Sequence, residues 1–310
     1  MNRRVAWPNG HKFAFTFVDD ADWATMARVR PIYDLITDLG MRSTKTVWML
    51  NASSGARNEG STCENPAYLD WNLSLQERGF EIALHCASAG SSTREQTRFA
   101  IERFRTLFGD RPFIHCNHTG CADNMYWGDA RLSGWRRTIY NILTRGRRRH
   151  SSWGHVEGSP HFWGDLCRGH VSYVRNFVFD NLNTLEVCPE MPYHDPARPY
   201  VNQWFAASDG GSAARFLRNC APARIDRLAE SGGAGIVYVH FAAGFAENGA
   251  VREEVRKRLE YIAAKDGWFA TTSEILSHLG NGRPLEISWK ELRRLEVRWL
   301  KACIRRGKTL

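Results

Sequence analysis

The feature that most constrains the fold of this chain is a regular alternation of short apolar runs with segments of helical spacing. Apolar runs at 13–18, 44–50, 81–85 and 113–118 predict strands, and helical patterns lie between them at 24–39, 67–77 and 93–108. The alternation resumes later, with strands expected at 200–206 and 235–240. Strands separated by helices of about 10–15 residues are typical of βαβ units and of a parallel sheet or barrel. The sequence therefore predicts an α/β fold.

Two segments stand outside this alternation. Residues 119–195 are dense in Trp, His, Gly and Asp and include the arginine run RGRRR at 145–149. Because long excursions from compact domains are commonly functional, we expect an insertion over the mouth of a barrel. Residues 284–310 predict a basic amphipathic helix, which either packs on the barrel or serves as a dimer or membrane-surface face. The barrel itself is expected to span 1–283.

The composition indicates which classes of partner the protein is expected to bind and in which compartment it is expected to reside. Lys and Arg number 42 against 33 Asp and Glu, so the net charge is +9, which favours acidic partners such as anionic glycans or sugar nucleotides. No nucleic-acid-binding motif accompanies the basic runs. The eight cysteines form no CxxC pair, which argues against a zinc ribbon. We see neither a secretory leader nor an apolar run of about 18 residues that could span a membrane, and we expect a cytoplasmic protein with free thiols.

Polar side chains gather where the predicted strands end. Asp19 and Asp20 end the first strand, His85 ends the third, His115 to His118 end the fourth, and His240 ends a late strand. In parallel sheets and barrels these carboxyl ends meet at one face, which is where reactive groups collect. Of two neighbouring carboxylates, one can bind a divalent metal while the other takes a proton from a water, and a histidine can protonate the leaving group.

At these positions the sequence resembles the polysaccharide deacetylases, the NodB-homology family. The stretch FTFVDD at 15–20 is similar to the family's Thr-Phe-Asp-Asp-Gly motif, EIALH at 81–85 to the strand that delivers a ligand histidine, and IVYVHF at 236–241 to the strand of the catalytic histidine. The resemblance covers roughly residues 12–280. It implies a deformed (β/α) barrel with a divalent metal, for which zinc is the expected ion. It also implies Asp19 as general base, Asp20 and His85 as metal ligands, and His240 as catalytic acid.

The sequence departs from the family pattern at several positions. Ala89 stands where the family has its second ligand histidine, Ala21 replaces the glycine after the aspartate pair, and Val18 is an extra residue within the motif. The family's Arg-Pro-Pro-Tyr-Gly, whose arginine braces the base, would align with HCNHTG at 115–120, which has no arginine. The usual ligand set is therefore incomplete. His118 is the preferred third ligand, with His115 as the other candidate, because the fourth strand ends beside the third.

Further residues are predicted to line the mouth of the barrel and contact a carbohydrate. Aromatic faces stack on sugar rings, and charged side chains bond their hydroxyl groups. The predicted substrate-binding residues, taken from the irregular segment and the stretch that follows it, are Trp163, Asp165, His194 and Arg198.

These observations favour a metal-dependent hydrolase that removes an acyl group, expected to be N-acetyl, from an amino sugar or glycan precursor. Two other functions stay open, namely a glycosidic-bond hydrolase without metal and a catalytically silent carbohydrate-binding protein. Simpler interpretations also stay open for single residues. Asp19 and Asp20 would suit the cap of the next helix, and His85 and His240 would suit a buried core. The C-terminal helix is a candidate surface for a homo-oligomer.

Overall fold

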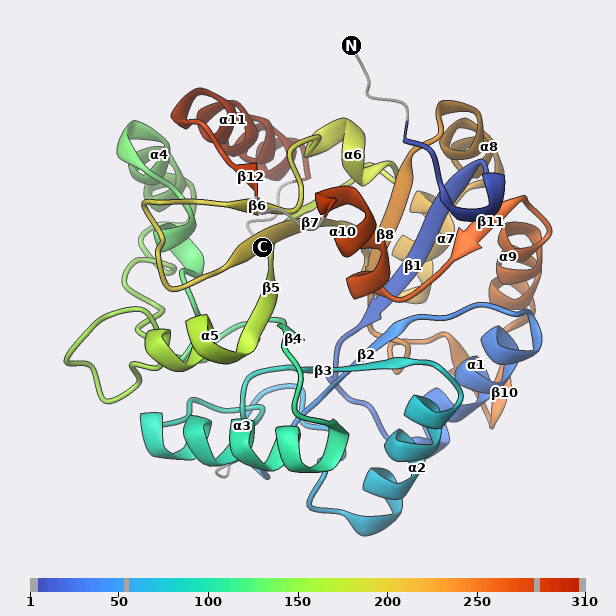
Figure 1. Ribbon diagram of the computed structural model, residues 1–310, viewed down its shortest axis with the longest axis horizontal. Coiled ribbons are helices and arrows are strands. Elements are labelled where there is room, and N and C mark those ends of the chain that lie inside the picture. The colour runs from blue at the N-terminus through green and yellow to red at the C-terminus, as the bar shows by residue number, and fades with distance from the viewer. Residues whose placement is uncertain (1–4, 53–55, 282–284, 307–310) are drawn as a thin grey trace.

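Seven parallel strands form a closed barrel in the part of the chain that the structure describes (Figure 1). The structure is a computed structural model, and it describes residues 5–52, 56–281 and 285–306. Strand β8 closes the ring because it pairs with both β7 and β1. The barrel strands are β1 (Phe13–Asp19), β2 (Thr44–Val47), β3 (Glu81–Leu84), β4 (Phe113–His115), β5 (Val171–Phe179), β7 (Gln203–Gly210) and β8 (Ala234–Val239). The predicted α/β barrel is confirmed.

The barrel is deformed at β1, which has three neighbouring strands. One edge of β1 pairs with β8 from Ala14 to Asp19. The other edge pairs with β2 only at Val18 and Asp19, and with β11 (Gly267–Phe269) at its amino end. Strand β1 is buried along its whole length, as expected for a strand that is covered on both faces. The irregular pairing leaves the carboxyl end of β1 fixed between β2 and β8.

Helices cover the outside of the barrel and follow the strands in chain order (Figure 1). Each turns an apolar stripe towards the strands, such as Val29, Ile32 and Ile36 of α1. Among the helices that the structure describes, none has both the length and the apolarity to cross a bilayer. The covering helices are α1 (Met26–Asp38), α2 (Pro66–Glu77), α3 (Arg94–Phe108), α7 (Ala213–Asn219), α8 (Pro222–Ser231), α9 (Glu253–Ala263) and α10 (Thr272–Gly280).

The stretch 119–195, expected to be one insertion, contains a strand of the barrel. Strand β5 pairs in parallel with both β4 and β7, so it divides the stretch into two connections. The polar pair Arg175 and Asn176 interrupts its apolar run, which hid the strand pattern. The first connection holds η2 (Gly128–Arg131), α4 (Gly134–Leu143) and α5 (Gly164–His170), and the second holds α6 (Thr184–Val187) and β6 (Tyr193–His194). The remaining short elements are η1 (Pro8–Gly10), β9 (Ala246–Glu247), β10 (Ala250–Val251) and β12 (Leu285–Glu286).

The C-terminal helix α11 (Trp289–Arg306) packs on the rest of the protein. This is the first of the two alternatives that the sequence analysis left open for it. Its buried side includes Leu292, Leu295 and Trp299. The Trp299 ring lies 5.6 Å from that of Tyr140 in α4 and 5.2 Å from that of Phe177 in β5. Residues 1–4, 53–55, 282–284 and 307–310 of the two predicted domains lie outside the described residues.

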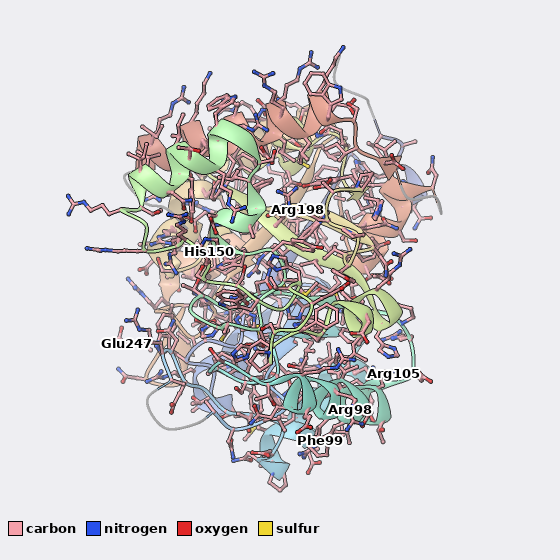
Figure 2. The ribbon with its side chains drawn as sticks, turned by 90° about the vertical axis from the view of Figure 1, so that its left-hand side faces the viewer. Arg98, Phe99, Arg105, His150, Arg198 and Glu247 are labelled. Carbon is pink, nitrogen blue, oxygen red and sulfur yellow. The ribbon has the colours of Figure 1, made fainter. Side chains whose placement is uncertain are left out.

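One buried carboxylate joins α11 to the segments beneath it. Glu296 is fully buried and accepts hydrogen bonds from Arg136 and from the Ser133 hydroxyl, both of the α4 region. Arg198, which Figure 2 places beside α4, approaches the same carboxylate at 3.7 Å and pairs with Asp195. A buried charge is tolerated only when such partners surround it. Glu296 therefore fixes how α11, α4 and the β6–β7 connection fit together.

Replacing Glu296 with alanine should lower the free energy of unfolding by about 3–5 kcal/mol, because Arg136 would be left buried without its counter-charge. Urea denaturation monitored by circular dichroism measures this loss. The matched control is Glu260→Ala, which removes an exposed glutamate of α9 and should change the free energy by less than about 0.5 kcal/mol. Equal, small effects of both substitutions would contradict the inferred importance of the buried pair.

Candidate metal and catalytic site

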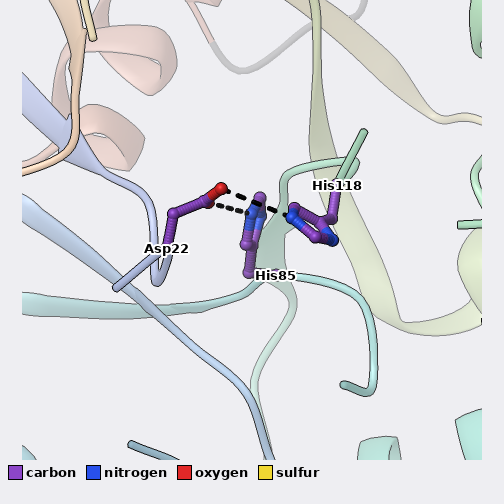
Figure 3. A group of neighbouring side chains, drawn as sticks. All are labelled: Asp22, His85 and His118. Atoms are coloured by element: carbon purple, nitrogen blue, oxygen red, sulfur yellow. Dashed lines mark hydrogen bonds and ion pairs between the residues drawn. The ribbon is translucent and has the colours of Figure 1, made fainter. Parts of the chain in front are cut away.

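The carboxylate of Asp22 lies among three imidazoles that come from three different strand ends. Asp22 Oδ2 is 3.1 Å from Nε2 of His85, which follows β3, and 3.4 Å from Nε2 of His240, which follows β8. Asp22 Oδ1 is 3.3 Å from Nε2 of His118, just beyond β4. Figure 3 shows Asp22, His85 and His118 turned towards one another. All four side chains are buried, so the carboxyl end of the barrel holds a compact acid–imidazole cluster.

Contacts at the far side of each ring keep Nε2 directed at Asp22. The Nδ1 atom of His85 lies 3.0 Å from the Cys116 carbonyl, and that of His240 lies 2.8 Å from the Gly211 carbonyl. Nδ1 of His118 lies 3.3 Å from the sulfur of Cys121. Metal-binding histidines characteristically have such a partner on their second ring nitrogen. Within the described residues, His118 Nε2 is buried without a well-formed hydrogen bond.

The charges of this cluster depend on one another. Burial alone would raise the pKa of Asp22, but the close imidazoles of His118, His240 and His85 hold it well below its ordinary value. Burial would lower the pKa of His118, whereas Asp22 and Cys121 raise it to about 10. The pKa of His240 is also raised, because Asp22 outweighs the effect of burial. The cluster therefore pairs an ionised Asp22 with His118 and His240, whose protonated forms Asp22 stabilises.

Asp20 lies beside this cluster in a bidentate pair with Arg175. Arg175 Nη1 donates to Asp20 Oδ1 at 2.7 Å and Nη2 to Oδ2 at 2.5 Å. The guanidinium also lies over the ring of Tyr238, 4.5 Å from its centroid. Burial would raise the pKa of Asp20, but Arg175 and then His85 lower it overall. Asp20 is consequently an ionised carboxylate next to the imidazole cluster, with Oδ2 3.9 Å from His85 Nε2.

Asp19 points the other way, as the alternation of side chains along a strand requires. Its Oδ1 accepts a hydrogen bond from the Phe241 backbone at 2.8 Å, and its Oδ2 lies 3.2 Å from Nζ of Lys45. Tyr33 of the outer helix α1 donates to the same Oδ2 at 3.0 Å. Asp19 is thus enclosed between the barrel wall and the helical layer. The structure does not bring it together with His85, His118 and His240.

The position where the resembling family has its second histidine is apolar here. Ala89 packs with Ala21 and Trp48 in a small buried cluster. The Trp48 ring lies 5.6 Å from that of His85 and 5.4 Å from that of His118. Trp48 therefore forms a wall behind both imidazoles. His118, which the sequence analysis preferred as third ligand beside Asp20 and His85, lies 3.3 Å from Asp22 and comes from the neighbouring strand.

The four predicted substrate-binding residues lie outside this cluster. Trp163 is buried and donates to the Asp123 carbonyl, Asp165 is exposed and pairs with Arg94, and Arg198 is bound by Asp195 and Glu296. His194 lies on β6, which pairs with the amino end of β7, opposite the end that carries the imidazoles. Each of these side chains has an evident structural partner.

Sequence reasoning missed two residues that the structure places at the centre. Asp22 is the third acidic residue within four positions, and this spacing was its only signal. Arg175 lies in the middle of an apolar run, where a charged residue requires a buried partner. Taking 119–195 as one insertion hides the signal that Arg175 gives within this apolar run.

Replacing Asp22 with asparagine should lower the pKa of His118 well below 10 in the metal-free protein, because burial would no longer be opposed by the carboxylate. Titration of the histidine ring signals by NMR in the presence of a chelator measures the shift. Asp165→Asn is the control, since Asp165 is an exposed carboxylate bound to Arg94. An unchanged titration of His118 in the Asp22 variant would contradict the proposed coupling.

Comparison with known proteins supports the fold. The sequence matches no family profile, and no curated protein shows significant similarity to it. A solved protein from Mycobacterium smegmatis, assigned to the polysaccharide deacetylases, is 13% identical with a TM-score of 0.52, over 92% of this chain and 96% of that one. The peptidoglycan deacetylase PdaC of Bacillus subtilis is 14% identical with a TM-score of 0.39, over 93% and 98% of the chains. The catalytic domain of a peptidoglycan N-acetylglucosamine deacetylase from Eubacterium rectale is 12% identical with a TM-score of 0.34, over 93% of each chain. The first of these likenesses confirms the predicted fold, which is the polysaccharide-deacetylase type of barrel.

Proposed function

We propose that this protein is a metal-dependent hydrolase that removes an acyl group, N-acetyl in the simplest case, from an amino sugar or glycan precursor. The observation that carries the proposal is the position of Asp22, within 3.1–3.4 Å of three imidazole Nε2 atoms at the carboxyl end of the barrel. An ionised carboxylate, Asp20, lies beside them. Ligands, base and acid are thus close together on a fold that polysaccharide deacetylases share.

The residues at this place fit a divalent metal, for which zinc is the expected ion. Asp22, His85 and His118 would hold it, since their ligand atoms all lie within 4.8 Å of one another. Nε2 of His118 is buried and lies 3.3 Å from Asp22 without a well-formed hydrogen bond, so a metal beside that carboxylate would satisfy it. When bound, such an ion polarises a carbonyl group and lowers the pKa of a water. Three protein ligands would leave a position open for that water.

Within this proposal, the base and ligand roles move from Asp19 and Asp20 to Asp20 and Asp22. Asp20 is ionised and faces the imidazoles, whereas Asp19 is bound by Lys45, Tyr33 and the backbone of Phe241. Arg175 would brace the base, the task of the arginine that segment 115–120 lacks. His240 keeps the role of catalytic acid, because its Nε2 faces the cluster from the end of β8, 3.4 Å from Asp22.

The reaction then follows from what these side chains can do. Asp20 accepts a proton from the attacking water, whose oxygen forms a bond to the amide carbon. The carbon–nitrogen bond breaks as His240 gives its Nε2 proton to the departing amine, and the Tyr238 hydroxyl, 3.0 Å from that nitrogen, helps to orient the ring. The products are acetate and a free amino group on the sugar.

The charges at the site favour this reaction over glycosidic-bond hydrolysis without metal. That reaction uses two carboxyl groups, of which one must stay protonated to act as the acid. Here the pKa values of both Asp20 and Asp22 are lowered, so neither suits that task. A cytoplasmic precursor as substrate is part of the proposal, and it is supported by the free thiols of all eight cysteines.

Asparagine variants of the three aspartates should separate their roles. Asp20→Asn should lower kcat for release of acetate from an N-acetylated amino sugar about 10²–10⁴-fold, because general base catalysis is lost, with zinc content unchanged. Asp22→Asn should lose both the bound zinc and the activity. Zinc is measured by elemental analysis of purified protein, and Asp165→Asn serves as the control.

Asp19→Asn should reduce the free energy of unfolding by about 3 kcal/mol, because Lys45 would stay buried without its carboxylate. The fraction of this variant that stays folded should retain most of the wild-type kcat. If instead Asp19→Asn abolishes turnover in a stable, zinc-loaded protein while Asp20→Asn does not, the base is Asp19. Zinc-loaded wild-type protein that releases no acetate from any acylated amino sugar would favour a silent carbohydrate-binding protein.

Zinc binding at pH 8 should release about one proton, because His118 carries one below about pH 10 and must lose it to become a ligand. The apparent affinity should therefore rise about tenfold per pH unit through this range. Isothermal titration calorimetry in buffers of different ionisation enthalpy measures the protons released. His118→Ala should abolish the release, and a binding heat independent of the buffer in wild-type protein would contradict His118 as a ligand.

A further inference from the structure

Helix α4 presents its apolar side to solvent and its charged side to the protein. Trp135 and Ile142 are 48% and 71% exposed, and Leu143 is exposed beside them. Residues 135, 139 and 142 follow the i, i+4, i+7 spacing of one helical stripe. On the opposite side, Arg136 and Tyr140 are the buried residues of the helix. This is the reverse of the usual arrangement on the surface of a globular protein.

Two arginines of α4, the buried Arg136 and the partly exposed Arg137, have specific partners, so the orientation of the helix is fixed. Arg136 is bound by the buried Glu296 of α11. Arg137 lies 2.8 Å from the carboxylate of Asp129, which is itself buried. Turning the helix by half a revolution would separate both pairs and bury unpaired charges. The exposed apolar stripe is therefore a stable feature of the folded protein.

Cationic side chains flank this stripe on two sides. The exposed Arg145, Arg147 and Arg149 follow the carboxyl end of α4. Helix α11 lies next to α4 (Figure 1), and the two are in contact through Tyr140 and Trp299. Its outer side exposes Trp289, at 67%, and Ile304, together with the cations Lys290, Arg293, Arg294, Arg298, Lys301 and Arg305.

We propose that the exposed sides of α4 and α11, together with 145–149, bind the surface of an anionic lipid membrane. Interfacial helices insert apolar and aromatic side chains at the boundary of headgroups and acyl chains, and their Lys and Arg contact lipid phosphates. Both components occur here on adjacent helices. The inference is independent of the proposed function, because no residue of this face belongs to the acid–imidazole cluster.

The arrangement of charges favours a lipid surface over the other partners for an apolar face. In a two-fold dimer the same patch meets itself, which would bring the arginines of both copies close together. A nucleic acid would satisfy the cations, but it would leave the aliphatic Ile142 and Leu143 without an apolar contact. An anionic membrane satisfies both the cations and the apolar stripe.

Co-sedimentation of the full chain with vesicles tests this proposal. Wild-type protein should bind vesicles of phosphatidylcholine with about 30% phosphatidylglycerol, and binding should weaken as salt increases. The triple substitution Arg293→Glu, Arg294→Glu, Lys301→Glu should lower the partition coefficient at least a hundredfold, since each cation near such a surface contributes about fivefold. Trp135→Ser with Ile142→Ser should lower it at least tenfold by removing the apolar contact.

The matched control is Arg168→Glu, Arg218→Glu, Arg227→Glu, which makes the same change in net charge at exposed arginines outside the face. This control should retain most of the binding, and unchanged thermal unfolding should show that all variants are folded. Equal losses in the control and the α11 variant would overturn the proposal in favour of general charge attraction. Wild-type protein that does not bind the vesicles would also overturn the proposal. The same holds if the α4 stripe proves to be needed for a dimer in solution.

Discussion

The carboxylate of Asp22 holds together the end of the barrel at which three strands deliver a histidine. A buried carboxylate is costly unless hydrogen-bond partners or positive charge surround it. His85 Nε2 lies at hydrogen-bond distance, 3.1 Å from Asp22, and the imidazoles of His118 and His240 bring positive charge. The dependence is mutual, because Asp22 raises the pKa of His118 and His240 against the effect of burial. The protons on these imidazoles thus balance the charge of Asp22, as a bound divalent cation would. Under the proposed function, zinc binding here would therefore release protons from the imidazoles that become ligands.

Three aspartates within four positions are kept distinct because each has its own cationic partner. Asp19 meets Lys45 on one side of the barrel wall, Asp20 meets Arg175 on the other, and Asp22 meets the imidazoles. The alternation of side chains separates the first two. The third reaches the cluster only because the chain has left the strand by then. Asp20 and Asp22 consequently lie close together in different environments, as the proposed roles of base and ligand require.

The sequence was sufficient to predict the barrel, from periodicity together with the family resemblance, and the same periodicity led us to expect His85, His118 and His240 at one end of it. Strand ends at His85, His118 and His240 could be read from apolar runs that stop at a polar residue. The difference between the environments of the three aspartates could not be predicted in this way. It depends on Lys45 and Arg175, whose distances from Asp19 and Asp20 are set by strand register and ring closure, and Arg175 is 155 residues from Asp20 along the chain. Trp163, Asp165, His194 and Arg198 were predicted to bind substrate from residue type alone. Each has a partner in the folded chain that residue type does not reveal.

Two buried pairs between an arginine and a distant carboxylate determine the features that matter most for function. Such pairs add little net stability, yet breaking one is costly, so they act mainly by excluding other arrangements. The pair of Asp20 with Arg175 decides which carboxylate faces the imidazoles. The pair of Arg136 with Glu296 decides which side of α4 faces the protein, and so leaves Trp135 and Ile142 exposed. Because the second pair joins α4 to α11, the apolar stripe and the basic helix are held in one fixed relation to each other. A surface that must meet lipid phosphates and acyl chains at the same time requires that relation.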